Sequence, residues 1–269
     1  MSRPAASSST QWPLPAEDDW STPFAELLLE QLDLRPGLAI LDIACGHGIP
    51  DFYLAEQVGP TGSVLGIDAS RGQVAGARML QRGELPWLRF ECCDMRALPA
   101  TFPAFHRITG NLSVMFLRPH RFEAMRGLIE HLAPGGQVVL TFPSLGTFDS
   151  IWQRIDQEMS RHGLTIERER LAAHVAERPS AAEARGWLEQ LNMERIGVIE
   201  RPLEVASGSG QRFLQHPLLR GGFLDDAYEC FDDASLAERV MTSVAADMES
   251  MMPLTARRCA LSGWKPGQA

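Results

Sequence analysis

The sequence predicts an α/β fold, with a mostly parallel sheet of seven strands and helices on both of its faces. Short apolar runs lack the polar alternation of a half-exposed strand, which suits strands that are buried on both faces. Up to about residue 145 these runs alternate with helical patterns through short loops, as in a parallel sheet with right-handed crossovers. From Ser150 the pattern is mostly helical, and two more strands follow.

The clearest strand is the apolar run from Leu38 to Ala44, in which Asp42 is the one charged residue. A buried carboxylate is costly unless it has a partner. The stretch ILDIACGHG, residues 40–48, then supplies Gly46 and Gly48, which carry no Cβ and so allow a sharp turn and the close approach of a ligand. This stretch therefore predicts a strand that ends at a ligand crevice.

The other elements follow in order along the chain. Further strands are expected at residues 64–68, 88–94, 106–114, 137–142, 195–205 and 254–262. Helices are expected after a Thr22-Pro23 cap, from Pro50, at residues 70–82 and at 119–132, with capping-box signatures at Ser180–Glu183 and Ser235–Glu238.

The domain organisation follows from loop lengths. Residues 1–20 are rich in small polar residues and proline and are expected to form a flexible tail, so that 21–269 is a single domain. The segment between the last two strands is too long for a hairpin loop, so residues 207–252 are interpreted as an inserted helical cap.

Composition limits the class of partner. The chain has 25 basic and 34 acidic residues, a formal charge of −9, and Lys265 is its only lysine. Nucleic-acid binding depends on clustered basic side chains, so a small-molecule substrate is expected and a nucleic acid is not. The five cysteines show no CxxC spacing, which indicates neither a disulfide framework nor a metal site.

The N-terminal stretch MSRPAASSSTQWPLP has no apolar signal-peptide region, and no apolar run approaches the roughly 20 residues that span a bilayer. A cytoplasmic protein without a membrane span is expected.

Three carboxylates belong to successive strands: Asp42 lies inside the first, and Asp68 and Asp94 end the next two. All three would gather at the carboxyl edge of the sheet. Asp68, after the glycine turn of the preceding strand, suits the two hydroxyls of a ribose and so indicates a nucleoside-bearing cofactor. A dinucleotide site would need a third glycine where Asp51 stands, and the charge of Asp51 would oppose a pyrophosphate. A P-loop is excluded because no GK[ST] follows.

Five motifs now stand in order: ILDIACGHG, VLGIDAS, ECCDMRALP, ITGNLSVMFL and HLAPGGQVVLTFP. With them the chain resembles the class I S-adenosylmethionine-dependent methyltransferases, especially the branch of ubiquinone/menaquinone-type and small-molecule enzymes, over about residues 35–145. The resemblance implies a Rossmann-like fold, S-adenosylmethionine as cofactor, and methyl transfer.

The resemblance also implies a cofactor site. Its residues would be Asp42 for the ammonium group, Gly46 and Gly48 with Ala44 and Cys45 around the methionine moiety, Asp68 for the ribose, Ala69, Asp94 and Met95 for the adenine, and Asn111 near the methionine end or the methyl group. Simpler alternatives stay open: Asp94 as the cap of a turn, Met95 as core, and Cys45 as a buried filler.

The acceptor is less defined. Asn111 is followed by Leu112-Ser113-Val114, so the Pro-Pro-aromatic motif associated with amide and base N-methylation is absent. His216, in the predicted cap, is the candidate general base. Met and aromatic residues of the cap and its neighbours favour an apolar or aromatic small acceptor, methylated at O, C or N.

Three alternatives to a methyltransferase differ in class. A non-catalytic subunit that binds S-adenosylmethionine stays open, whereas Asp51 disfavours a nicotinamide-dependent oxidoreductase. An aminopropyl transferase lacks a paired acidic substrate motif. The cap helices also offer a surface for a homodimer.

Overall fold

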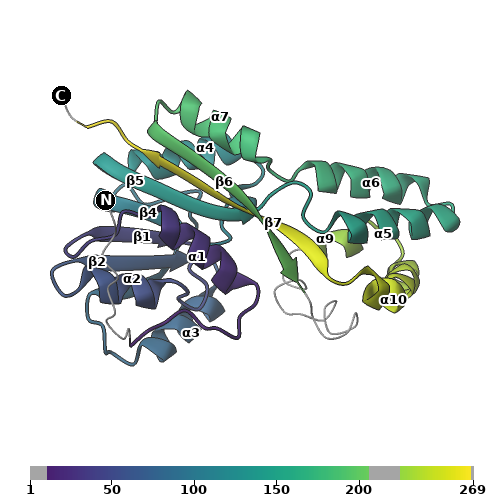
Figure 1. Ribbon diagram of the computed structural model, residues 1–269, viewed down its shortest axis with the longest axis horizontal. Helices are drawn as coiled ribbons and strands as arrows, with labels where there is room; N and C mark the ends of the chain where they lie inside the picture. The colour runs from purple at the N-terminus through teal and green to yellow at the C-terminus, as the bar shows by residue number, and fades with distance from the viewer. Residues whose placement is uncertain (1–10, 206–224, 268–269) are drawn as a thin grey trace. The chain divides into compact units, whose positions relative to one another are not determined.

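The computed structural model describes residues 11–205 and 225–267 of the chain (Figure 1). These form two compact units. The first takes the chain up to Phe142, Ala182–Ile199 and the residues from Cys259; the second takes Pro143–Ala181 and Glu200–Arg258.

The sheet has seven strands, as the sequence predicts, in the order β3-β2-β1-β4-β5-β7-β6. They are β1 (Ala39–Ile43), β2 (Ser63–Asp68), β3 (Leu88–Cys92), β4 (Phe105–Gly110), β5 (Leu132–Pro143), β6 (Glu194–Val205) and β7 (Leu254–Trp264). The pairs from β3 through to β5 are parallel. β7 runs antiparallel to β5, because Gly135 pairs with Lys265 while Ser144 pairs with Arg257. Strand order reverses between β1 and β4, which is where ligands bind in open α/β sheets.

The helices of the first unit are α1 (Ser21–Gln31), α2 (Asp51–Val58), α3 (Arg71–Gln81), α4 (Arg121–Glu130) and α7 (Ala181–Gln190), with a 3₁₀ turn at Val114–Leu117. The core on one face of the sheet joins α1, α2 and α3 to β1, β2 and β3 through residues such as Leu28, Leu54, Val74, Ile40 and Phe90. Figure 1 shows α4 and α7 on the other side of the sheet. The predicted covering of both faces is therefore confirmed.

The start of α1 differs from the predicted cap. The helix begins at Ser21, and the N–H groups of Ser21 and Trp20 donate to the Asp18 carboxylate. The Thr22 hydroxyl instead donates to the carbonyl of Pro15. Residues 11–20, which the sequence assigned to the tail, also pack: the Trp12 and Phe52 rings stack with centroids 4.8 Å apart. Packing thus begins before Ser21.

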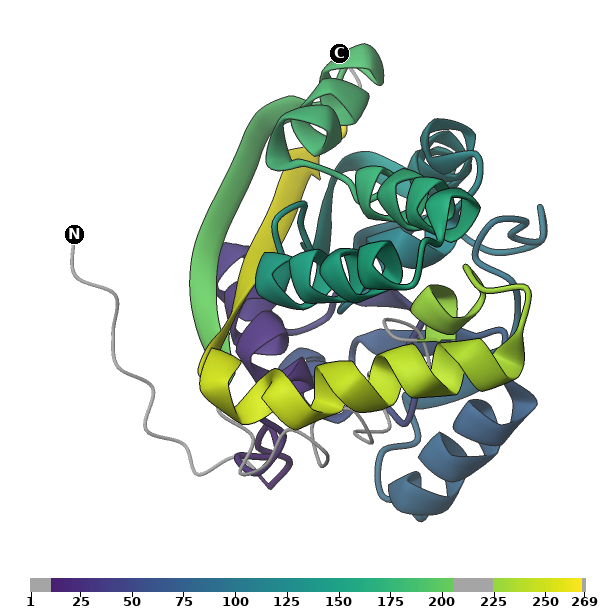
Figure 2. The same cartoon turned by 90° about the vertical axis from the view of Figure 1, so that its right-hand side faces the viewer.

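The described part of the second unit contains the ends of β6 and β7 and four helices: α5 (Asp149–Arg161), α6 (Thr165–Ala176), α9 (Asp225–Tyr228) and α10 (Ala234–Met251). Figure 2 shows α10 running beside α5. Residues 207–224 of the predicted cap, 207–252, lie outside the described residues; its described part, from residue 225, belongs to this unit together with residues 143–181. The cap of α10 is Asp233, whose carboxylate accepts from the N–H groups of Ser235 and Leu236, rather than Ser235.

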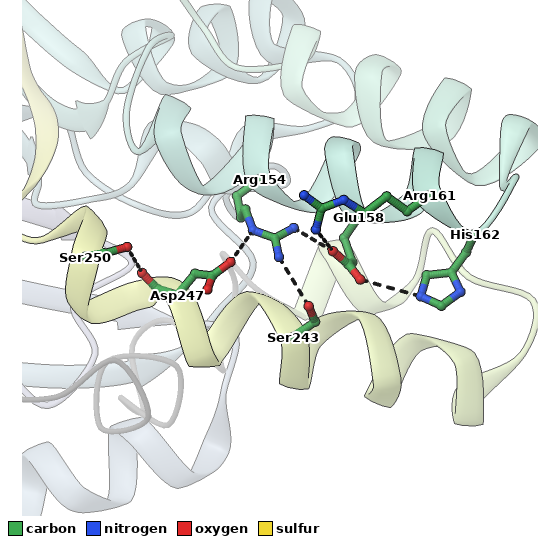
Figure 3. A network of polar contacts seen from close by, with 7 residues as sticks. All are labelled: Arg154, Glu158, Arg161, His162, Ser243, Asp247 and Ser250. Atoms are coloured by element: carbon green, nitrogen blue, oxygen red, sulfur yellow. Dashed lines mark hydrogen bonds and ion pairs between the residues drawn. The ribbon is translucent and has the colours of Figure 1, made fainter.

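A polar network joins α5 to α10 (Figure 3). Arg154 Nη1 lies 2.8 Å from Glu158 Oε2 on its own helix, and Arg154 Nε lies 2.7 Å from Asp247 Oδ2 on α10. Glu158 is almost fully buried and also accepts from Arg161. Because a buried carboxylate without donors is strongly destabilising, this network lets Glu158 sit between the two helices.

Lys265, the only lysine of the chain, caps the C-terminal end of α4. Lys265 Nζ donates to the carbonyl oxygens of Ile129 at 2.8 Å and Leu132 at 2.7 Å. A cation there satisfies exposed carbonyls and complements the helix dipole. Over the described residues, none of the helices combines the length and the apolar character that crossing a membrane requires.

Candidate cofactor site

The predicted site residues, apart from His216, lie at or just beyond the carboxyl ends of β1 to β4 in the first unit. The segments after β1 and β3 both stay bound to β2. The Cys45 N–H donates to the Ile67 carbonyl, and the Cys93 N–H donates to the Asp68 carbonyl, each at 3.0 Å. These bonds bring together the turn after β1 and the acids that end β2 and follow β3.

The two glycines of the turn have different roles. Both have positive φ, 54° at Gly46 and 96° at Gly48. A Cβ at Gly48 would lie 2.6 Å from the Phe52 ring and 3.1 Å from the Phe90 ring, so Gly48 is required by packing. A Cβ at Gly46 would meet nothing nearer than Gln73 Oε1 at 4.0 Å. Gly46 therefore leaves its backbone open to a ligand.

Asp68 is held at the end of β2 by two backbone donors. Its Oδ2 accepts from the Gly46 N–H at 3.0 Å, and its Oδ1 accepts from the Ser70 N–H at 2.8 Å. Each carboxylate oxygen has two lone pairs, so the group can accept further hydrogen bonds. The Asp68 carboxylate is therefore fixed in place and can still receive the hydroxyls of a ribose.

Asp42 lies fully buried in β1, where its Oδ1 accepts from the Thr109 hydroxyl of β4. Burial raises the pKa of Asp42 to about 6; the hydrogen bonds of Thr109 and Asp51 oppose this shift, and the charge of Asp68 adds to it. Apart from the neighbouring Asp51 carboxyl, no group of the described residues donates to Asp42 Oδ2. The Thr109 hydroxyl thus serves only one oxygen of this buried acid.

Asp51 is a site residue that sequence reasoning missed. Its carboxyl is fully buried at the start of α2, and a Cβ on Gly66 of β2 would lie 2.6 Å from Asp51 Oδ1. Burial, followed by the charge of Asp42, raises the pKa of Asp51 well above its usual value. The sequence argument that Asp51 would oppose a pyrophosphate is thus corrected, because this carboxyl lies against the sheet. An acid three residues after the glycine turn was the available signal.

Asp94 caps a turn, which is the simpler of its two predicted roles. Its carboxylate accepts from the Arg96 N–H at 2.9 Å and from Arg96 Nη2 at 2.7 Å, which caps the turn after β3. The hydrogen bond from Arg96 lowers the pKa of Asp94. Met95 is buried beside it, and Ala69 is exposed at the end of β2. The contacts of Asp94, Met95 and Ala69 with an adenine stay predictions.

Asn111 is tied into the fold beyond β4. Its Nδ2 donates to the Ser21 carbonyl at 3.0 Å, and its Oδ1 accepts from the Thr141 hydroxyl at 2.8 Å. Its place near the methyl group stays a prediction. His47, between the two glycines, is exposed, and its ring packs over Gly76 of α3. His216 lies outside the described residues.

Cys45 and Ala44 complete the turn after β1. Cys45 is buried, and burial raises the pKa of its thiol, so the thiol stays protonated. This environment agrees with the filler alternative. Ala44 is half-buried with φ at 52°.

The residues present fit S-adenosylmethionine. Asp42 Oδ2 is a buried acceptor that meets no donor of the described residues besides the Asp51 carboxyl, and its remaining lone pair suits the ammonium group. The open backbone at Gly46 suits the methionine chain, and the fixed carboxylate of Asp68 suits the ribose.

Comparisons with known proteins agree with this fit. Residues 40–136 match the family model described as a methyltransferase domain. Methyltransferase GfsG of Streptomyces halstedii is 30% identical over 201 residues, which cover 71% of this chain and 68% of that protein. Nocamycin O-methyltransferase of Saccharothrix syringae is 38% identical over 45% of this chain and 43% of its own length. The tRNA (guanine(6)-N2)-methyltransferase of Thermus thermophilus is 36% identical over 43% of this chain and 37% of its own length.

The fold has solved counterparts. The structure of Haemonchus contortus phosphoethanolamine N-methyltransferase 2 with phosphomonomethylethanolamine and S-adenosylhomocysteine aligns over 91% of this chain and 53% of its own, with a TM-score of 0.56 and 14% identity. That likeness concerns the fold alone. The family match, the length of the alignment to methyltransferase GfsG and the fit of the site together show that the chain belongs to the class I S-adenosylmethionine-dependent methyltransferases.

Proposed function

We propose that this enzyme transfers the methyl group of S-adenosylmethionine to a small apolar or aromatic metabolite. The observation that carries the proposal is the cofactor site: a fixed Asp68, an open Gly46 backbone and a buried Asp42 with an unused oxygen. A relative named for the O-methylation of nocamycin supports a small acceptor. An oxygen acceptor is therefore tested first, followed by carbon and nitrogen.

The cofactor supplies an electrophilic methyl group on a sulfonium. The residues of this chain would bind and orient the cofactor: Asp42 would hold the ammonium group, Asp68 would hold the ribose, and Gly46 would allow close approach. Alignment of an acceptor with the methyl group accelerates such a displacement without a residue that reacts covalently. A general base is needed only for a protonated acceptor, and His216 stays the candidate.

A nucleic-acid acceptor is not part of the proposal. The relative that acts on tRNA matches over 37% of its own length, so most of that enzyme has no counterpart in the alignment. The net charge of −9 and the single lysine disfavour a polyanionic acceptor. The proposal includes a homodimer through the helices of the predicted cap, residues 207–252, and a location in the reducing cytoplasm. The five cysteines all lie within the described residues and form no disulfide there.

Calorimetric titration tests the cofactor, with S-adenosylmethionine, S-adenosylhomocysteine and NAD(H) in one series. The two sulfur nucleosides should bind and NAD(H) should not. Transfer of an isotopically labelled methyl group is then measured with a set of hydroxylated aromatic acceptors. Binding without transfer to any acceptor would favour the non-catalytic subunit.

His216→Ala tests the base. Turnover should fall while the affinity for S-adenosylhomocysteine stays unchanged, because a base acts on the acceptor. A fully active variant would remove His216 from the reaction. His162→Ala is the control, because His162 pairs with Glu158 in the second unit.

A further inference from the structure

Two buried carboxyl groups face each other beneath the glycine turn. Asp42 on β1 and Asp51 at the start of α2 are both fully buried, and each is among the causes that shift the pKa of the other. Gly66 of β2 pairs with Asp42 and lies against Asp51 Oδ1, so the two carboxyl groups are neighbours. Thr109 donates to Asp42 Oδ1. Within the described residues, no other group donates to Asp42 Oδ2 or to either oxygen of Asp51. Because neither ionised carboxylate can donate, a bond between them requires a proton on one of the two.

The surroundings decide which group holds that proton. The groups that face the pair are the Thr109 hydroxyl of β4, the protonated Cys45 thiol, and Asp68 at the end of β2. The causes of the pKa shifts include no cationic side chain from the described residues. The Thr109 hydroxyl donates to Asp42 and so favours its ionised form, whereas no such donor among the described residues reaches either oxygen of Asp51. Near neutral pH, Asp51 is thus the acid and Asp42 the anion.

Packing keeps Asp51 in this place. Its Oδ1 lies where a side chain on Gly66 would stand, so the carboxyl rests on the backbone of β2. The absence of a Cβ at Gly66 makes room for an acid at this depth. A carboxylic acid held neutral by burial can serve as a hydrogen-bond donor.

We propose that Asp51 is a positioning residue, which as a neutral carboxylic acid donates a hydrogen bond to Asp42 and orients that carboxylate toward the ammonium group of S-adenosylmethionine. The inference rests on the proposed function for its ligand, while the hydrogen bond itself is a property of the protein alone. No covalent bond changes: the proton stays on Asp51, and Asp42 remains the acceptor.

Infrared spectroscopy of the ligand-free protein at pH 7 tests the hydrogen bond. The wild type should show the C=O stretching band of a neutral carboxylic acid, and Asp51→Asn should lack it. Asp94→Asn is the matched control, because Asp94 is an ion-paired acid, and its replacement should leave the band in place. A wild type without the band, or a band that survives in Asp51→Asn, would overturn the proposal.

Binding of S-adenosylhomocysteine tests the positioning role. Asp51→Asn keeps a donor and should bind within about threefold of the wild type at pH 7, whereas Asp51→Ala should bind about tenfold more weakly. The pH at which binding is half lost should also move upward in Asp51→Ala, since Asp42 loses a donor. Equal affinities of the two variants would refute the role. Should the wild type bind no S-adenosylhomocysteine while the infrared band is present, the proposed function fails and the hydrogen bond stands.

Discussion

A single carboxylate joins the turn after β1 to the end of β2: Asp68 Oδ2 accepts from the Gly46 N–H at 3.0 Å. Its other oxygen accepts from Ser70, the residue that caps α3. Asp68 therefore shapes the glycine turn as well as offering acceptors to a ribose. Replacement of Asp68 should affect both the stability of the protein and the binding of the cofactor.

Asp68→Ala should weaken S-adenosylmethionine binding at least about tenfold and lower the free energy of unfolding by about 1–2 kcal/mol, since two N–H groups lose their acceptor. Calorimetry and urea denaturation measure the two effects. Asp233→Ala is the matched control, because Asp233 also accepts from two backbone N–H groups, at the start of α10. It should lose similar stability with unchanged affinity. Unchanged affinity in a folded Asp68→Ala would refute the ribose role.

Comparison of Gly46→Ala with Gly83→Ala separates the effect of backbone strain from the close approach of a ligand to the Gly46 backbone. Gly46 and Gly83 both have positive φ, 54° and 77°, and a Cβ at either meets no atom closer than 4.0 Å. Both alanine variants should therefore lose about 1 kcal/mol of stability. Only Gly46→Ala should weaken S-adenosylhomocysteine binding, as calorimetry would show. Equal affinities would mean that the ligand does not approach this backbone.

Asp42 should make the ligand-free protein less stable as pH rises. Its folded pKa is about 6, above the unfolded value of 3.8, so the folded state binds more protons between these values. The contribution of Asp42 to the free energy of unfolding is fully present below pH 3.8. It is lost as pH rises through about 6, and the loss is at most about 3 kcal/mol. In urea denaturation, the free energy of unfolding of Asp42→Asn should rise relative to that of the wild type between pH 4 and pH 7.

A parallel pair of stability curves for Asp42→Asn and the wild type would contradict that prediction. Asp94→Asn provides a control of opposite sign. Because Arg96 lowers the pKa of Asp94, that carboxylate stabilises the folded protein above its unfolded pKa and loses the effect as pH falls. As pH rises, the stability of Asp42→Asn should therefore increase relative to the wild type, and that of Asp94→Asn should decrease.

Arg154→Ala should destabilise the protein by about 1–3 kcal/mol, because it leaves buried Glu158 without its main donor and Asp247 without a partner. Arg185→Ala is the matched control, since Arg185 and Glu189 form an exposed pair 3.9 Å apart on another helix. Its cost should stay within about 0.5 kcal/mol. Denaturant titration compares the two, and equal costs would mean that burial does not strengthen the network.

The sheet could be predicted because each of its strands has a local signal. The run from Leu38 to Ala44 is apolar throughout except for Asp42, and β1 lies within it. The position of Asp68 beside the glycine turn was predictable for a similar reason, since the carboxyl ends of parallel strands meet at one edge. The order of the strands then brings Gly46 and Asp68 together although 22 residues separate them.

Long-range packing was not predictable from local patterns. The sequence indicates Asp51 as a charge that would oppose a pyrophosphate, and only the direction of α2 over Gly66 places it beside Asp42. The association of α5 with α10 depends on contacts such as that of Arg154 with Asp247, which lie 93 residues apart. At a shorter range, Ser235 fits the capping-box spacing, but Asp233, two residues earlier, takes the cap.

The two-unit organisation has a consequence for how new enzymes of this kind arise. The chain passes between the units after Phe142, Ala181, Ile199 and Arg258, so the second unit consists of two inserted segments. The stretch that matches the family model, residues 40–136, lies entirely outside them. Exchange of both segments with those of a paralogue, by recombination or in a designed chimaera, would therefore alter more than a third of the enzyme and leave the residues predicted to bind the cofactor unchanged.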